Sequence, residues 1–251
     1  MLNHPTLEKL QTMRLTGMLK ALQEQQETRE IEALSFEERL GLLLDREMTE
    51  RESKRLQTRL KKAKLRHRAV VEDINYRHPR RLDKSQVFKL CDCQWIKEHQ
   101  NLIITGPTGI GKSWLACALA QKACREGYSA LYTRMPRLLQ DVGISRGDGR
   151  YPKVMKELAK TDLLVLDDWG ISPLKAEQLR DLLEILEDRH GLRSTLVTSQ
   201  LSTKKWHEYL GDPTLADAIL DRLIHNAHRM DLQGDSMREL EASLTSKNSF
   251  D

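Results

Sequence analysis

Two patterns of hydrophobic and polar positions divide the chain. Up to about residue 68, leucines and methionines recur every three or four positions among Glu, Gln, Lys and Arg, which is the spacing of helices with one apolar face. Ser35 and Glu38 form a capping-box pattern that predicts a helix start, and one face of that helix continues through Phe36, Leu40, Leu43, Leu44 and Met48. The pattern predicts a small all-helical domain, residues 1–68, ending in a long helix that runs to about Arg68.

Beyond about residue 100, short apolar runs alternate with amphipathic stretches. The apolar runs cover residues 101–105, 130–133, 162–167, 194–198 and, more weakly, 228–232. Helical periodicity is clearest at 112–125 and 175–189. Buried parallel strands connected by helices have this pattern. The sequence therefore predicts an α/β domain with a parallel sheet, and we assign residues 69–251 to it.

A glycine-rich loop directly follows the first of these runs. It matches the phosphate-binding pattern G-x4-G-K-S, and we assign to nucleotide binding its eight residues Gly106, Pro107, Thr108, Gly109, Ile110, Gly111, Lys112 and Ser113. Glycine permits a backbone whose N–H groups converge on phosphate oxygens, and the positive end of the following helix adds to them. We expect Lys112 to contact the β and γ phosphates and the Ser113 hydroxyl to bind Mg²⁺, so ATP and Mg²⁺ are the predicted ligands.

Two acids, Asp167 and Asp168, end the third apolar run. Such a pair also occurs as a helix cap, but after a phosphate-binding loop it predicts catalytic chemistry. We expect Asp167 to hold Mg²⁺ through water and Asp168 to orient or deprotonate an attacking water.

Positive charge is concentrated in one segment, although the net charge of the whole chain is only +4. Residues 51–81 contain twelve Lys and Arg against three acids. Like charges at i,i+4 lower helix stability unless something neutralises them. One interpretation is a solvated helix face. The other, which we favour, is contact with a nucleic-acid backbone through Lys54, Arg55, Arg59, Lys62 and Arg66, four of which are spaced as one stripe along a helix.

Other features limit the partners and the compartment. Aromatic residues make up 5% of the chain, too few for a broad base-stacking platform. A loop expected at 134–153 offers a second candidate DNA contact through Arg134, Arg137, Arg146 and Arg150. No apolar stretch predicts a membrane span. The four cysteines predict free thiols in the cytoplasm, the alternative being that Cys91 and Cys93 form half of a metal site.

The motifs, in this order and spacing, resemble those of the AAA+ ATPases. The chain is most similar to the IstB-type ATP-binding helper proteins of insertion sequences, which are relatives of the DnaC helicase loaders. The matching stretches are 73–80, 106–113, 163–170, 195–202, 220–223 and 228–239. The resemblance covers about residues 70–240 and implies a P-loop AAA+ ATPase domain preceded by a small helical domain.

The resemblance also implies roles for individual residues. Ser199 or Gln200, after the fourth apolar run, matches sensor one, which detects the γ-phosphate. Arg222 matches the arginine finger that is donated to a neighbouring subunit's ATP, and Arg238 matches sensor two. Thirteen residues follow Arg238, so we expect a vestigial C-terminal lid. Asp168 stands where many AAA+ proteins have Glu, and its shorter side chain predicts slow or partner-dependent hydrolysis.

By this resemblance, the chain is expected to be an ATP-dependent helper of a transposase. It would form a homo-oligomer on duplex DNA, with ATP at the subunit interfaces, and select or remodel the target DNA. A helicase loader, which acts on single-stranded DNA with a replicative helicase, is the alternative. A metabolic nucleotide kinase also has a phosphate-binding loop, but it needs a lid and an acceptor site and has no use for the basic segment.

Overall fold

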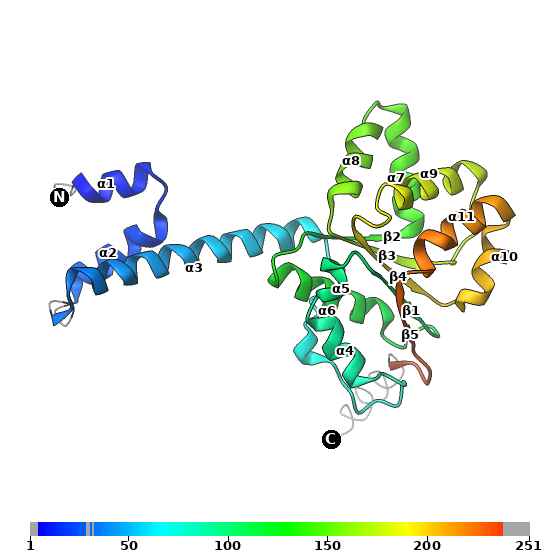
Figure 1. Cartoon of the computed structure of the whole chain (residues 1–251), viewed down its shortest axis with the longest axis horizontal. Coiled ribbons are helices and arrows are strands. Elements are labelled where there is room, and N and C mark those ends of the chain that lie inside the picture. The colour runs from blue at the N-terminus through cyan, green and yellow to red at the C-terminus, as the bar shows by residue number, and fades with distance from the viewer. Residues whose placement is uncertain (1–4, 29–30, 32, 238–251) are drawn as a thin grey trace, which may run out of the picture. The chain divides into compact units, whose positions relative to one another are not determined.

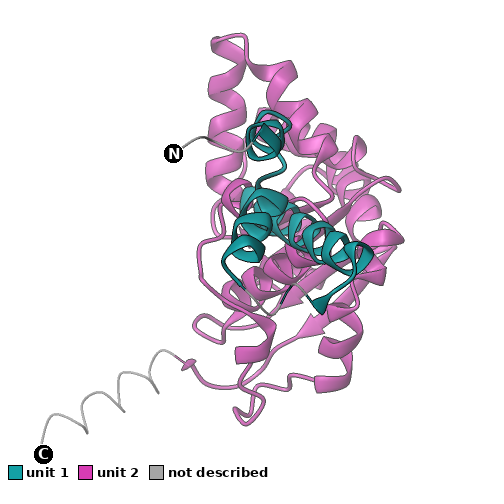
Figure 2. Ribbon diagram, turned by 90° about the vertical axis from the view of Figure 1, so that its left-hand side faces the viewer, with its two compact units in different colours: residues 1–58 teal, residues 59–251 magenta. Residues whose placement is uncertain are grey.

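The computed structural model describes residues 5–28, 31 and 33–237. The chain divides into two compact units, Met1–Thr58 and Arg59–Asp251 (Figure 2). In chain order the elements are α1 (Pro5–Thr12), α2 (Thr16–Glu27), α3 (Phe36–Ala63), η2 (Val71–Asp73), α4 (Lys84–Cys91), α5 (Gln94–Lys97), β1 (Asn101–Thr105), α6 (Lys112–Arg125), β2 (Ala130–Arg134), α7 (Met135–Gly147), α8 (Tyr151–Lys160), β3 (Leu163–Trp169), α9 (Ala176–Glu187), β4 (Ser194–Ser199), η3 (Thr203–Lys205), α10 (Trp206–Leu210), α11 (Pro213–Ile224) and β5 (Ala227–Asp231) (Figure 1). No helix in the described part of the chain is both long and apolar enough to cross a membrane.

The first unit is helical, and a buried carboxylate joins two of its helices. Oε2 of Glu47, on α3, accepts hydrogen bonds from the backbone N–H groups of Gly17 (2.6 Å) and Met18 (3.1 Å) at the start of α2. Burial opposes the charged form of Glu47, but hydrogen bonds from Arg51 and these two amides outweigh it and lower the Glu47 pKa. A Cβ atom at Gly17 would lie 2.6 Å from the Glu47 Cα, so the close contact requires glycine here.

The predicted capping box is present at the start of α3. The Ser35 amide donates to Glu38 Oε2 (2.8 Å) and the Glu38 amide donates to Ser35 Oγ (3.3 Å). The apolar face predicted from there on is only partly buried, because Phe36 is 74% exposed and Met48 61% exposed. The periodicity therefore predicted the helix correctly but did not predict how little of its apolar face is buried.

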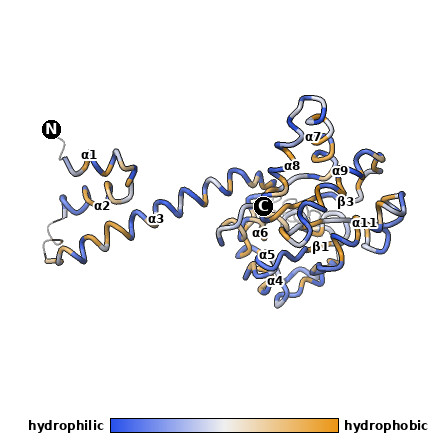
Figure 3. The backbone as a smooth tube through the Cα atoms, turned by 45° about the horizontal axis from the view of Figure 1, so that its top comes forward, coloured by the Kyte–Doolittle hydropathy of each residue, from blue (hydrophilic) through white to orange (hydrophobic). Residues whose placement is uncertain are grey.

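The long helix ends earlier than its periodicity predicts. α3 stops at Ala63, and Lys64 adopts a left-handed conformation with φ 51°. A left-handed residue ends a helix because it turns the chain out of the helical path, so that the i→i−4 hydrogen bonds do not continue. Much of the second half of α3 is coloured as hydrophilic (Figure 3), as its run of Lys and Arg requires. Arg66 therefore lies beyond the helix and is not the fourth member of a helical stripe.

The second unit is built on the predicted parallel sheet. Its five strands lie in the order β2-β3-β4-β1-β5, and all four neighbouring pairs are parallel. The observed bounds of β1 and α6 are those expected from the sequence. This order brings the carboxyl ends of β1, β3 and β4 to one edge of the sheet, which is where an open α/β sheet binds ligands.

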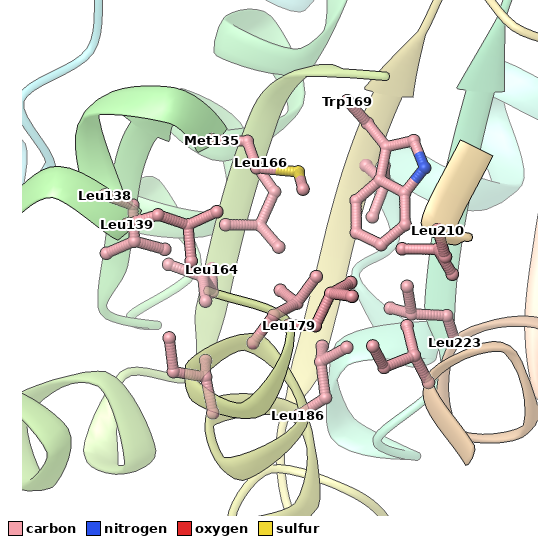
Figure 4. Close-up of a cluster of buried hydrophobic side chains, with 14 of the residues drawn as sticks. Met135, Leu138, Leu139, Leu164, Leu166, Trp169, Leu179, Leu186, Leu210 and Leu223 are labelled. Carbon is pink, nitrogen blue, oxygen red and sulfur yellow. The ribbon is translucent and has the colours of Figure 1, made fainter. Parts of the chain in front are cut away.

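Helices cover both faces of the sheet. Side chains from one face, including Leu164, Leu166 and Trp169 of β3, form a core with α7, α9, α10 and α11 (Figure 4), while α6 packs on the strands with buried Leu115 and Leu119. The segment expected as a loop at 134–153 is helical instead, since it forms α7 and α8. Pro136 and Pro152 fall in the first turns of these helices, where proline is tolerated.

Candidate nucleotide site

The phosphate-binding loop connects the end of β1 to the start of α6. Gly106, Gly109 and Gly111 have φ values of 149°, 81° and 95°, which L-amino acids with side chains rarely adopt. The glycines therefore allow the loop to curl around the first turn of α6, whose free N–H groups favour an anion. The Lys112 ammonium donates to the carbonyl oxygens of Gly106 (2.7 Å) and Pro107 (2.8 Å), and so lies against the loop itself.

A cluster of oxygen atoms lies beside the loop. Oδ1 of Asp167 accepts a hydrogen bond from Ser113 Oγ at 2.8 Å and another from the Thr198 hydroxyl, while its Oδ2 accepts one from the Tyr132 hydroxyl. Asp167 is fully buried. Burial and the hydrogen bond to Asp167 raise the pKa of Tyr132, so this hydroxyl stays a donor.

The geometry suits a hard divalent cation. Carboxylate and hydroxyl oxygens are the ligands that Mg²⁺ prefers, and it keeps several waters in addition. Asp167 and Ser113 were both selected from the sequence, and the structure brings them together. Tyr132 and Thr198 were not selected, because only the adjacency of β2, β3 and β4 reveals that they reach Asp167.

Asp168 is held apart from this cluster. Its φ of 63° is left-handed, and its Oδ2 accepts a hydrogen bond of 2.5 Å from Arg134 Nε at the end of β2. Asp168 and Lys112 line the same cavity of about 150 Å³. The predicted catalytic acid thus faces the loop lysine, while its carboxylate is paired with a guanidinium.

The two sensor-one candidates differ in what they contact. The Ser199 hydroxyl is buried, donates to the Trp169 carbonyl (2.8 Å) and accepts from the Leu201 amide (3.0 Å), so its hydrogen bonds stay within the end of the sheet. Gln200 is exposed, and its Oε1 accepts a hydrogen bond of 2.7 Å from the Thr108 hydroxyl of the loop. Both residues line the cavity with Lys112.

Arg222 lies far from the loop of its own chain. Its carbonyl accepts a hydrogen bond of 2.9 Å from Nδ2 of Asn101, which is the first residue of β1. The phosphate-binding loop follows the last residue of that strand. The four steps of about 3.3 Å between the first and last residues of β1 put these two points roughly 13 Å or more apart. The guanidinium pairs with Glu187 at 2.5 Å, which raises the Arg222 pKa. Arg238 lies outside the described residues, as does the predicted lid.

The five basic residues predicted to contact DNA fall into two groups, according to whether the side chain has a partner among the described residues. Lys54 donates to Thr16 Oγ1 (2.7 Å), Arg59 Nε donates to the Cys124 carbonyl (2.8 Å), and Arg66 shares a hydrogen bond with the Tyr132 hydroxyl that raises the Arg66 pKa. Arg55 and Lys62 are exposed on α3.

Arginines of the 134–153 segment are paired within the chain. The partner of Arg134 is Asp168, that of Arg137 is Asp141, that of Arg146 is Asp181 and that of Arg150 is Asp148. These pairs disfavour the segment as a second DNA contact, since each arginine already has a carboxylate neighbour.

A sheet in this order, with a phosphate-binding loop after β1 and acids at the end of β3, defines a P-loop ATPase of the AAA+ class. Solved structures share the fold: DnaI (TM-score 0.56, 21% identity, covering 66% of this chain and 91% of that one) and the replication initiator DnaA bound to AMPPCP and single-stranded DNA (TM-score 0.56, 16% identity, 74% and 57%).

The chain belongs to the IstB-like ATP binding protein family, whose profile matches residues 8–245. It is 57% identical to an insertion sequence ATP-binding protein of Sinorhizobium fredii, over 95% of this chain and 97% of that one. It is 50% identical to the ATP-binding protein of insertion sequence IS1162 from Pseudomonas fluorescens, over 80% and 87%. The protein is therefore an ATP-binding AAA+ ATPase of the insertion-sequence type.

Proposed function

We propose that the protein is the ATP-dependent helper of a transposase, and that it assembles on duplex DNA to select or remodel the target of insertion. One observation carries most weight: a complete phosphate-binding loop and buried Asp167 share a chain with a segment of twelve Lys and Arg against three acids. Insertion-sequence relatives at 57% and 50% identity favour transposition over helicase loading. The likeness to DnaI, at 21% identity, is one of fold.

In this proposal the Ser113 hydroxyl would hold Mg²⁺ directly and Asp167 would hold it through water, since these neighbouring oxygens match its ligand chemistry. The ion supplies charge neutralisation for the phosphates. Lys112 exchanges the two loop carbonyls for phosphate oxygens, which are stronger acceptors because they are charged. Asp168 accepts a proton from, or orients, the attacking water.

Hydrolysis is slow until a partner arrives. The support is the 2.5 Å contact between Arg134 and Asp168, because the carboxylate has to leave this contact before it can bind the attacking water. Gln200 is the better sensor-one candidate, since it hydrogen-bonds the loop through Thr108, whereas Ser199 bonds only to backbone near it.

Subunits join through ATP. Arg222 lies at the amino edge of the sheet, where its own loop is out of reach, so a phosphate contact would have to be made to a neighbouring subunit. In this proposal residues 1–68 provide DNA binding and assembly, and residues 69–251 form the ATPase domain. All four cysteines are free thiols, which suits the cytoplasm, where the partners are duplex DNA and the transposase of the same element.

Electron microscopy and sedimentation with ATP and duplex DNA of unrelated sequence test the proposal. Regular oligomers should form with ATP and duplex, and Lys112→Ala should prevent them while leaving the fold intact. The cognate transposase should co-purify with the assembled form. Preference for single-stranded DNA and recruitment of a replicative helicase would instead identify a helicase loader.

A further inference from the structure

A buried arginine at the end of the 73–80 stretch, to which no role has been assigned so far, lies against the phosphate-binding loop. The Arg80 side chain is 1% exposed. Its Nη1 donates to the Ile110 carbonyl at 3.1 Å and lies 3.1 Å from the Met237 sulfur, and its Nη2 donates to the Asn75 carbonyl at 3.2 Å. A Cβ atom at Gly111 would lie 2.6 Å from Nη1. The guanidinium therefore packs directly on the loop backbone, one residue before Lys112.

The hydrogen bond to Ile110 fixes the orientation of one peptide unit. In a trans peptide, the carbonyl oxygen of Ile110 and the N–H of Gly111 point in opposite directions. Holding the oxygen toward Arg80 turns that N–H away from Arg80. A phosphate-binding loop works because its N–H groups converge on the phosphates, so an N–H of Gly111 that points away from Arg80 is oriented for phosphate binding.

The charge of Arg80 has only neutral acceptors in the described part of the chain. Its partners there are the carbonyl oxygens of Ile110 and Asn75 and the Met237 sulfur, and its buried Nε has no hydrogen-bond partner among those residues. Burial lowers the Arg80 pKa and outweighs the opposing effect of Tyr76. Because the guanidinium packs on the phosphate-binding loop, a bound nucleotide would bring negative charge close to this buried cation, whose acceptors among the described residues are all neutral.

We propose that Arg80 positions the phosphate-binding loop and that its charge increases affinity for the nucleotide carrying most negative charge, so that it favours ATP over ADP. The inference rests on the nucleotide site proposed above. It adds Arg80, from the segment that precedes α4, as a positioning residue. Arg80 contacts the face of the loop opposite the phosphates, whereas Lys112 lies on the phosphate side.

The chain offers a matched control in Arg189. This side chain is also 1% exposed, and it donates to the carbonyl oxygens of Leu158, Thr161 and Ser194. Burial lowers its pKa to about 9. Arg189 therefore has the same burial and the same kind of acceptors as Arg80, without touching the loop.

Three full-length variants test the proposal: Arg80→Met, Arg80→Lys and Arg189→Met. Calorimetry gives the dissociation constants of MgATP and MgADP, and thermal unfolding without nucleotide gives stability. Arg80→Met should weaken ATP binding about 10- to 100-fold and weaken ADP binding less, and it should lower the nucleotide-free melting temperature because two carbonyl oxygens lose their donor. Arg189→Met should lower the melting temperature and leave both affinities within about twofold.

Arg80→Lys separates charge from geometry and carries the test if Arg80→Met does not fold. It should weaken ATP and ADP equally, because it keeps the charge and loses the fork that holds Ile110. Wild-type ATP affinity in either Arg80 variant, or equal loss of ATP and ADP in Arg80→Met, would overturn the inference. Absence of ATP binding by the wild-type protein would instead overturn the proposed function.

Discussion

DNA binding by the basic segment can be divided between residues that the structure leaves exposed and residues that it engages. Arg55 and Lys62 are exposed on α3 and have no hydrogen-bond or ion-pair partner among the described residues, whereas partly buried Arg59 donates to the Cys124 carbonyl and Arg66, although exposed, to the Tyr132 hydroxyl. We therefore compare two double variants with equal loss of charge, Arg55→Gln with Lys62→Gln and Arg59→Gln with Arg66→Gln. Glutamine keeps helix propensity, so the helix itself should survive.

The expected magnitude follows from counterion release. Each phosphate neutralised contributes about 0.9 to the slope of log affinity against log salt, so the exposed pair should reduce the slope by about 1.8. Over a fourfold range of salt, this is about a twelvefold difference in affinity. The loss should be equal for unrelated duplex sequences, since phosphate contacts carry no base information.

The engaged pair should behave differently. Its slope should fall by less than about 0.9 in total, because these guanidinium groups already have partners inside the chain. Its melting temperature should fall by a few degrees, at about 2–4 °C per kcal/mol for a unit of this size. Fluorescence anisotropy from 50 to 200 mM salt measures the slopes. Equal slopes for the two pairs, or an unchanged slope for the exposed pair, would refute this division.

Further outcomes concern the site and the thiols. Asp168→Asn should bind ATP normally and reduce turnover by roughly 10²–10⁴, and a phosphate-release assay that finds wild-type turnover would make Asp168 structural. Arg222→Ala should keep ATP affinity in the monomer but lose ATP-dependent assembly. Mixing it with Asp168→Asn protein should restore some ATPase activity, because one site can then combine an intact Arg222 with an intact Asp168 from two subunits. No restored activity at any mixing ratio would contradict a site shared between subunits. Burial raises the pKa of Cys93 and of Cys124 to about 11, above the ordinary 9. The folded state thus favours the neutral thiols, so their contribution to stability is complete below pH 9 and is lost as the pH rises toward 11, which melting curves at pH 8 and 10 can check.

The sequence predicts those parts of the protein in which local pattern and structure agree. The bounds of β1 and α6 match because an unbroken apolar run and a glycine loop mark them. Residues 134–153 were expected as a loop, but they form α7 and the start of α8. Glycines and prolines in this segment are typical of turns, and the tertiary packing of Leu138, Leu139 and Leu158 outweighs that tendency.

Residues that act from a neighbouring strand could not be predicted in the same way. The loop and the acids of β3 are contiguous motifs, so Ser113 and Asp167 were found. Arg134 and Tyr132 reach those acids only because β2 pairs with β3, in a register that places Arg134 opposite Asp167. Strand order depends on the whole fold, and one sequence does not reveal it.

The irregular end of β3 explains why the second acid is Asp. Between Leu166 and Trp169, β3 advances three residues while β4 advances two, from Val197 to Ser199, so Asp168 is an extra residue in the ladder. A regular strand would send neighbouring side chains to opposite faces, and the bulge instead lets both acids reach the ligand edge. Asp168 has a left-handed φ of 63°. This conformation costs most residues about 1–2 kcal/mol, and among residues with a side chain Asp and Asn tolerate it best. The backbone conformation at position 168, as well as the reach of the side chain, thus favours the short Asp. Replacing Asp168 by Glu would add conformational strain at this position in addition to any effect on catalysis.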